Sequence, residues 1–320
     1  MSNSSAPIVE LRSVSKSLGE RTVLKGVSLN IPKGSIFGII GENGSGKSTL
    51  LELMIGCTSP DHGSVHIMRG SQRLTYDKHP KAILDMCGFS PQRPSLCDDL
   101  TVRENLAYFG RLWNLDEETL KKNITTVMVI CTLEPWADMP VLALSAGIRK
   151  RADIGCALIH NPAVLFLDDP MSGLDKKEAG RIFGLLSHIS KAGVTIILAT
   201  SSIDDASNLC TRVALLRDAT IIGPFHVNDL LKRADGPKEI MLQTREGKYQ
   251  DIAGILYTSK AGLLRAGMRG PWFVTQANDA SALLHHLLHV CKQTGQTIVA
   301  IQMDRPSVRD AIRAVYEVQR

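Results

Sequence analysis

A glycine-rich stretch near the start of the chain, GENGSGKST from Gly41 to Thr49, has the residue types and spacing of a phosphate-binding loop. It follows the apolar run Ile36–Ile40, which we predict as a strand, and precedes Leu50–Ile55, which we predict as a helix. Glycines here let backbone N–H groups curl around phosphate oxygens at the positive end of the helix dipole. The residues expected to contact phosphate are Gly41, Asn43, Gly44, Ser45, Gly46, Lys47, Ser48 and Thr49.

The same loop predicts a magnesium site. Lys47 would reach the β- and γ-phosphates, and the Ser48 hydroxyl would bind Mg²⁺. The stretch AVLFLDDPMSGLD, which starts at Ala163, ends an apolar run in two carboxylates, Asp168 and Asp169. A Mg²⁺ ion beside a phosphate loop needs a carboxylate at a neighbouring strand end, and Asp168 is placed for that role. Asp169 follows Asp168 directly, and its role is the main chemical question that this sequence raises.

Two further stretches contain groups that can contribute to a site. LSAGIRKRADIGCAL, which starts at Leu144, places Ser145 and Gly147 at the N-terminus of a predicted helix, where backbone N–H groups attract anions. FSPQRPSLCDDLTVRENL places Gln92 where the predicted strands give way to a helical segment. We therefore expect Gln92 at a junction between two parts of the fold.

Short apolar runs without alternation predict the strands that position these groups. They are Ile36–Ile40, Val164–Leu167, Thr195–Leu198 and Val213–Leu216. Strands buried on both faces of a parallel sheet have this pattern. Between about residues 94 and 160 the pattern becomes helical, over Val102–Leu112, Glu117–Leu133 and Ile148–Ile159. The sequence predicts an α/β fold, a P-loop NTPase core with a helical insert.

The polar segment KRADGPK, from Lys232 to Lys238, predicts a linker between residues 1–232 and an accessory domain over 233–320. The expected elements of this second domain are a strand at Ile240–Gln243, a helix at Tyr249–Tyr257, a strand at Trp272–Gln276, a helix at Ala280–Thr294, a strand at Thr297–Gln302 and a helix from Ser307. Alternation of this kind predicts a small α+β domain.

The composition limits the partners and the location that we expect. The net charge of +5 is mild for 320 residues, and the basic residues form no arm or stripe, so no nucleic-acid partner is expected. The N-terminus MSNSSAPIVE lacks the features of a secretory signal, and no apolar run is long enough to cross a bilayer. Seven cysteines without CxxC pairs indicate reduced thiols, so we expect a cytoplasmic protein.

The motifs of the first 230 residues or so resemble, in the same order, those of the nucleotide-binding subunits of ATP-binding cassette (ABC) transporters. In that family Gly41–Thr49 corresponds to the Walker A loop, Gln92 to the Q-loop glutamine, Leu144–Ile148 to the signature motif, Asp168 to the end of Walker B and Ser172–Asp175 to the D-loop. The resemblance implies ATP and Mg²⁺ as cofactors, with Ser48, Gln92 and Asp168 around the metal. It also implies a dimer in which each ATP lies between one chain's Walker motifs and the other chain's signature residues, here Ser145 and Gly147.

The tail MDRPSVRDAIRAVY, from Met303 to Tyr316, is similar to the end of cassette subunits that serve drug and antibiotic exporters of the daunorubicin-resistance kind. Those subunits pair with a separate membrane subunit. The resemblance therefore implies an exporter subunit that is peripheral at the cytoplasmic face of the membrane. The stretch DDLTVRENL, from Asp98 to Leu106, resembles the surface that docks a membrane subunit, and it fits an ordinary helix capped by Thr101 and Glu104 equally well.

Two departures from the family pattern fall on the catalytic positions. Asp169 stands where the family has a glutamate that polarises the attacking water, and its carboxylate falls short by about 1.5 Å, the length of one C–C bond. Ser201, or Ser202 if the alignment shifts by one residue, stands at the switch histidine, and a serine cannot carry charge. Asp169 can be interpreted as a weak base or as a position that no longer catalyses, and we favour the second interpretation.

Two further departures concern nucleotide contacts. Leu18 stands where most members stack an aromatic ring on adenine, so we expect apolar contact without π-stacking. The signature motif has Ala146 in place of a glycine and Ile148 in place of an amide side chain. The added methyl of Ala146 falls where a glycine lets the backbone approach a phosphate closely.

These features predict a chain that binds MgATP and hydrolyses it slowly, with Asp169, Gln92 and Ser201 at the catalytic positions. The loss of a positioned base or acid reduces a rate by about 10²–10⁴. A heterodimer with a competent second cassette is favoured, and a homodimer with two slow sites is the other assembly. The alternative function is a non-hydrolytic, ATP-dependent regulatory or interaction module without transport. A cassette ATPase acting on nucleic acid or ribosomes fits less well, because such proteins usually carry two cassettes or a long coiled coil.

Overall fold

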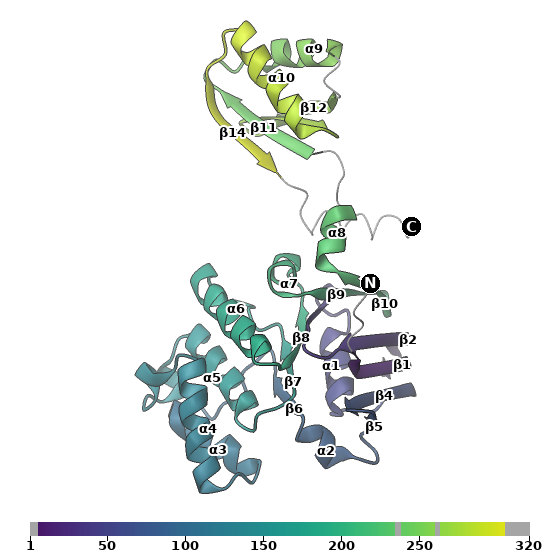
Figure 1. The fold of residues 1–320 in the computed structure, drawn as a ribbon, viewed down its shortest axis with the longest axis vertical. Helices are drawn as coiled ribbons and strands as arrows, with labels where there is room; N and C mark the ends of the chain where they lie inside the picture. Colours follow the sequence, from purple (N-terminus) through teal and green to yellow (C-terminus); the bar gives the residue numbers. More distant parts are fainter. Residues whose placement is uncertain (1–5, 234–237, 260–262, 305–320) are drawn as a thin grey trace. The chain divides into compact units, whose positions relative to one another are not determined.

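The computed structural model describes residues 6–233, 238–259 and 263–304 (Figure 1). Its contacts divide the chain into two compact units, Met1–Val227 and Asn228–Arg320. Residues 234–237, the middle of the predicted linker, lie outside the described residues. Each unit is described separately below.

A six-stranded sheet of order β10-β9-β3-β8-β7-β6 forms the centre of the first unit. Its strands are β3 (Ile36–Ile40), β6 (Cys87–Ser90), β7 (Val164–Asp168), β8 (Thr195–Thr200), β9 (Arg212–Arg217) and β10 (Thr220–His226). All neighbouring pairs are parallel except β9 and β10. Every residue of β3, β7 and β8 is buried, which explains their unbroken apolar sequences. The predicted parallel sheet is confirmed.

A second, antiparallel sheet of order β2-β1-β4-β5 was not predicted from the sequence. Its strands are β1 (Pro7–Leu18), β2 (Arg21–Pro32), β4 (His62–Arg69) and β5 (Gln72–Leu74). Helix α1 (Lys47–Ile55) contacts β4 of this sheet and β7 and β8 of the central sheet. One apolar core therefore extends from Leu11 through Leu50 and Leu51 to Phe166. The short helix α2 (Pro80–Leu84) precedes β6.

The predicted helical insert lies between β6 and β7 and gathers at the β6 side of the central sheet (Figure 1). It contains α3 (Val102–Leu112), α4 (Glu117–Ile130) and α5 (Ala146–Leu158). Helix α4 is shorter than predicted because Thr132 adopts a left-handed backbone conformation with φ 54° just after it. Helix α5 starts two residues earlier than predicted, with Ser145 at its N-cap. The capping box of Thr101 and Glu104 on α3 is confirmed.

Two helices complete the crossovers of the central sheet, α6 (Lys176–Lys191) between β7 and β8 and α7 (Ile203–Leu209) between β8 and β9. A further helix, α8 (Val227–Arg233), follows β10. Among the described residues, no helix combines the length and the apolar character that a membrane span requires.

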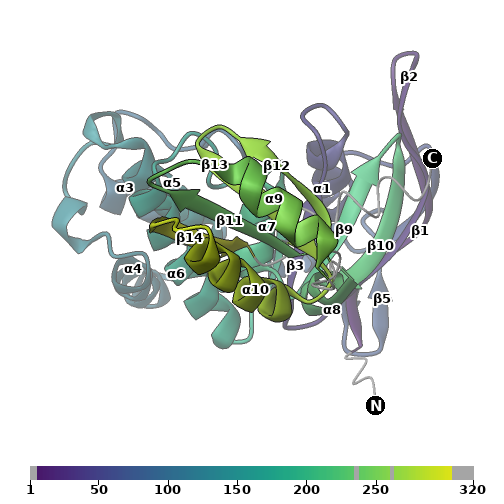
Figure 2. The same ribbon diagram turned by 90° about the horizontal axis from the view of Figure 1, so that it is seen from above.

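The second unit has the element order strand, helix, strand, strand, helix, strand. The elements are β11 (Lys238–Thr244), α9 (Tyr249–Thr258), β12 (Leu263–Arg269), β13 (Trp272–Ala277), α10 (Ala280–Gln293) and β14 (Ile298–Asp304). The strands form an antiparallel sheet of order β12-β13-β11-β14, and α9 and α10 pack on one face of it (Figure 2). Strand β12 was not predicted. The helix predicted from Ser307 lies outside the described residues, as does most of the tail Met303–Tyr316.

Candidate nucleotide-binding site

The loop between β3 and α1 is shaped by glycines that no other residue type could replace without strain. Gly44 and Gly46 have φ values of 77° and 105°, in the region that L side chains rarely adopt. A Cβ at Gly46 would also lie 2.5 Å from Cγ1 of Val23. The side chain of Arg21 secures the loop from outside, since its Nη2 donates to the carbonyl oxygen of Gly44 at 2.8 Å. The loop is therefore held close to β2 in a fixed curve.

Lys47, the first residue of α1, lies inside this curve. Its Nζ donates to the carbonyl oxygens of Gly41 and Glu42, both at 2.9 Å. Burial lowers the pKa of Lys47, while the carboxylates of Asp169 and Asp168 oppose this shift. The structure thus brings the loop lysine and both strand-end acids into one electrostatic cluster.

The polar side chains of the loop fit an anionic ligand. Ser48 and Asn43 are exposed, whereas Thr49 is buried. The hydroxyl of Ser45 is buried and has no hydrogen-bond partner among the described residues, which is costly for a polar atom. A Cβ at Gly41 would lie 2.5 Å from this hydroxyl. The loop thus offers an unused hydroxyl and an exposed Ser48 beside the helix N-terminus, a donor set suited to phosphate and its metal ion.

The two acids differ in their surroundings. Asp168 is the buried last residue of β7. Asp169 has left the strand, with φ 42°, and its backbone N–H donates to the carbonyl oxygen of Ala199 at 2.8 Å. Its Oδ1 accepts a hydrogen bond from the Thr200 hydroxyl at 3.3 Å. Burial raises the pKa of Asp169, and the Thr200 hydrogen bond and the charge of Lys47 oppose that shift.

Gln92 and Asp169 line one pocket, with a volume of about 340 Å³. Gln92 follows β6 and is exposed, so its amide is free to reach a ligand in this pocket. Ala146 and Lys150 of α5 line the same pocket. The structure therefore brings the Q-loop position, the end of β7 and the start of the signature helix together.

Ser145 and Gly147 do not line this pocket. Ser145 is the exposed N-cap of α5, and its side chain accepts no capping hydrogen bond. Gly147 is buried against α6, where a Cβ would lie 2.4 Å from Oε2 of Glu178. Both residues thus lie at the N-terminus of α5, on either side of Ala146, which does line the pocket of Gln92 and Asp169.

Ser201 and Ser202 follow β8, and their hydroxyls have different roles. The Ser202 hydroxyl is already engaged at the N-cap of α7, where it accepts from the backbone N–H of Asp205 at 3.2 Å. Ser201 is exposed, which favours it as the residue at the switch position. Leu18, at the end of β1, is 55% exposed and is thus available for apolar contact.

Three residues of this region were missed by the sequence reasoning. Thr200 holds Asp169, Arg21 holds the loop, and the buried Lys150 donates to the carbonyl oxygen of Pro91 next to Gln92. Lys150 also lies 3.6 Å from the carboxylate of Asp153. No local pattern indicates these residues, because their contacts with Asp169, Gly44 and Pro91 join segments that are far apart in the sequence.

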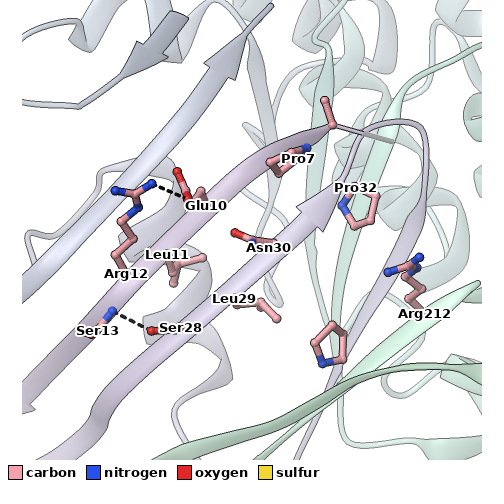
Figure 3. Close-up of a pocket in the computed structure, with 12 residues that line it drawn as sticks. Pro7, Glu10, Leu11, Arg12, Ser13, Ser28, Leu29, Asn30, Pro32 and Arg212 are labelled. Carbon is pink, nitrogen blue, oxygen red and sulfur yellow. Dashed lines mark hydrogen bonds and ion pairs between the residues drawn. The ribbon is translucent and has the colours of Figure 1, made fainter. Parts of the chain in front are cut away.

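A larger pocket, of about 710 Å³, lies on the sheet of β1 and β2 and contains none of the predicted site residues (Figure 3). Two pairs of its polar groups bond to each other. Arg12 donates to Glu10 at 2.8 Å, and the backbone N–H of Ser13 donates to the Ser28 hydroxyl at 2.9 Å.

Comparison with known proteins decides the family. The sequence profile described as ABC transporter matches residues 24–172. The Nod factor export ATP-binding protein I of Ralstonia nicotianae is 34% identical over 232 residues, which cover 72% of this chain and 71% of that protein. This chain belongs to the ABC transporter family, as an ATP-binding protein.

Other relatives of this ABC protein match a similar share of the chain. The Nod factor export ATP-binding protein I of Sinorhizobium fredii is 35% identical over 65% of this chain and 60% of its own length. The linearmycin resistance ATP-binding protein LnrL of Bacillus subtilis is 28% identical over 73% of this chain and 74% of its own length.

Solved cassettes have the same fold. CbiO1 from Clostridium perfringens, part of the ABC transporter complex cbiONQ, superimposes with a TM-score of 0.65 and 27% identity over 71% of this chain and 91% of its own. The MJ0796 cassette was solved as a dimer in a post-hydrolysis state with ADP and Pi. It superimposes with a TM-score of 0.61 and 29% identity, and the match covers 68% of this chain and 98% of that cassette. The predicted α/β P-loop fold of an ABC ATPase is thereby confirmed, and cassettes of this family form dimers and bind nucleotide.

Proposed function

We propose that this chain is the ATP-binding subunit of an ABC exporter and that it hydrolyses ATP slowly at its own site. Bound MgATP would supply the phosphoanhydride bond that is cleaved. Lys47 and the loop backbone would hold its phosphates, and Ser48, Gln92 and Asp168 would surround Mg²⁺. The unused Ser45 hydroxyl and the clustering of Lys47 with both acids support this assignment.

The position of Asp169 is the main observation that supports the proposed slow ATP hydrolysis. Its side chain is short, its backbone N–H donates to the carbonyl oxygen of Ala199, and its carboxylate accepts a hydrogen bond from Thr200. A base must reach the attacking water within about 2.6–3.2 Å, or through one further water. Ser201 adds a second deficit, since it cannot supply the charge of an imidazole.

The signature residues of this chain suggest how it would assemble with a second cassette. Ser145 and Gly147 would complete the site of a second cassette, which we propose to be a competent partner in a heterodimer, with the homodimer as the other assembly. A separate membrane subunit would span the bilayer, and this chain would lie peripherally at its cytoplasmic face. Export is supported by the relatives named for Nod factor export and linearmycin resistance. We further propose a cassette domain over residues 1–232 and an accessory domain over 233–320, as in exporters of the daunorubicin-resistance kind.

The nucleotide site is tested by measuring MgATP affinity of the full chain by calorimetry. Lys47→Ala should weaken binding by roughly tenfold or more, because hydrogen bonds from a charged donor contribute about 1.5–3 kcal/mol. Lys33→Ala, at an exposed lysine just before β3, is the matched control and should leave the affinity unchanged. An equal loss of MgATP affinity in both variants, or an unchanged affinity in both, contradicts the proposed site.

The weak catalytic positions also fit a non-hydrolytic regulatory module without transport. Purification of the chain from detergent-solubilised membranes of its own host separates the two functions. Copurification of a polypeptide with membrane spans and of a second cassette supports the exporter. If neither is present while MgATP binding is intact, the regulatory module is the better account.

A further inference from the structure

A third pocket in the first unit lies between the helical insert and α6, and none of the residues of the phosphate loop lines it. It has a volume of about 450 Å³, within the range of small-molecule sites. The end of α4, the turn at Trp136, α5 and α6 each contribute to its lining. We call it the α4–α6 pocket.

Arg151 of α5 forms the buried part of this lining and is only 3% exposed. Its Nη1 donates to the carbonyl oxygens of Cys131 at 2.9 Å and Thr132 at 2.7 Å, and its guanidinium lies 5.2 Å from the centre of the Trp136 ring. Its Nε and Nη2 have no hydrogen-bond partner among the described residues. Buried guanidinium donors without an acceptor are costly, so this site lacks an anion.

The other charged groups nearby do not supply that anion. Arg181 of α6 lines the pocket and is itself paired with Oε1 of Glu178. The Glu178 carboxylate acts on Arg151 through its charge, but among the described residues it makes no hydrogen bond to Arg151, and its Oε2 is unpaired. Burial lowers the pKa of Arg151, and the charge of Arg181 adds to this shift while Glu178 opposes it. His188 lies about two turns after Arg181 on α6 and is exposed at the pocket. Basic groups therefore exceed acids around the pocket.

Gly184 provides the open space between these side chains. It lies on α6 between Arg181 and His188 and lines the pocket, and a Cβ added there would meet no heavy atom within 4 Å. Leu185 and the Trp136 ring form apolar walls beside the cations. Basic groups at a buried base and at the rim, with apolar walls between them, are the features of a site for a small organic anion.

We propose that the α4–α6 pocket binds a small molecule bearing a phosphate group. The phosphate pairs with the free donors of Arg151 and with Arg181 at the rim, and the rest of the molecule packs on Trp136 and Leu185. A molecule bound there bridges the helical insert and α6. This site is separate from the nucleotide loop and does not depend on the proposed exporter function.

The test measures binding of inorganic phosphate at millimolar concentration to the full chain by calorimetry. Gly184→Leu fills the pocket without removing a charge and should weaken phosphate binding roughly tenfold or more. Gly180→Leu is the matched control, because Gly180 is also a glycine of α6 with open space around it but does not line the pocket. Phosphate held by the nucleotide loop is common to both variants, so a difference between them reports the pocket alone.

Arg181→Gln should weaken phosphate binding severalfold, with MgATP affinity unchanged in all variants. Sedimentation with vesicles of phosphatidylglycerol distinguishes a lipid headgroup from a soluble phosphate as the source of the ligand. Loss of either free-phosphate or vesicle binding in Gly184→Leu, and not in Gly180→Leu, supports the proposal. Equal binding of both probes by wild type, Gly184→Leu and Gly180→Leu overturns it.

Discussion

The backbone of Asp169 and the hydrogen bond from Thr200 limit how far its carboxylate can extend from the end of β7. Asp169 follows the buried Asp168, so two acids share the end of one strand beside Lys47. The hydrogen bond from Thr200 and the left-handed backbone fix where its side chain begins. A longer side chain on this backbone would extend further into the pocket that Gln92 lines. In the proposed slow site, residue length, more than charge, is therefore the expected deficit at this position.

Asp169→Asn should change stability in a pH-dependent way. Burial raises the pKa of Asp169 above the unfolded value of 3.8, so the folded state binds this proton more tightly. The stabilisation from the protonated group is complete below pH 3.8 and is lost as the pH rises through the folded-state pKa. Relative to wild type, the Asn variant should therefore gain stability between about pH 4 and pH 7. Urea unfolding across this range measures the difference.

Asp99→Asn is the matched control for this comparison, since Asp99 is exposed and has no hydrogen bond or ion pair among the described residues. A relative stability of Asp169→Asn that falls with rising pH would show that its carboxylate is stabilised as the anion. That result would argue for a poised, ionised base at this position.

At the scale of elements, the sequence correctly predicted the strands and helices whose residue pattern has one physical cause. Strands β3, β7 and β8 are buried on both faces and have continuous apolar sequences, and α3 begins at a capping box. Strand β12, LLRAGMR, contains a glycine and arginines and is mostly exposed, so no burial pattern marks it. The long strands β1 and β2 have several bulges that interrupt their alternation. The pairing of β1 with β4 is a long-range feature that local patterns do not indicate.

The cap of α3 gives a prediction at this scale. Thr101 accepts from the backbone N–H of Glu104, and Glu104 accepts from the backbone N–H of Thr101. Thr101→Ala should lower the free energy of unfolding by about 1 kcal/mol. Thr125→Ala is the control, because Thr125 is an exposed mid-helix residue whose hydroxyl bonds only to Lys121 in its own helix. Equal urea midpoints for both variants would contradict a stabilising capping box.

At the scale of the whole molecule, the two units have separate apolar cores. The first unit is built around both of its sheets, whereas the core of the second joins Leu242 and Phe273 of the sheet to Leu283 and Leu287 of α10. We therefore expect that each unit can lose stability without affecting the other. The site could be predicted from the sequence because its motifs are local, while the contacts of Thr200 and Lys150 depend on tertiary packing.

Leu287→Ala should destabilise the second unit by about 2–5 kcal/mol, since the side chain is fully buried. The neighbouring Leu288 on the same helix is 41% exposed, so Leu288→Ala should have a much smaller effect. Limited proteolysis with mass spectrometry locates the cleavage, which we expect within residues 238–304 only. MgATP affinity should be unchanged in both variants. A loss of nucleotide binding in Leu287→Ala would show that the units are coupled.

The most direct test of the central claim is MgATP hydrolysis by the purified chain, compared with Asp169→Glu/Ser201→His and with Lys47→Ala as the blank. The account predicts that wild type lies close to the blank and that the double variant gains roughly 10²-fold or more, as expected when a positioned base and acid are restored. Hydrolysis by wild type well above the blank, without a gain in the double variant, would contradict it. Asp169 would then be a working base.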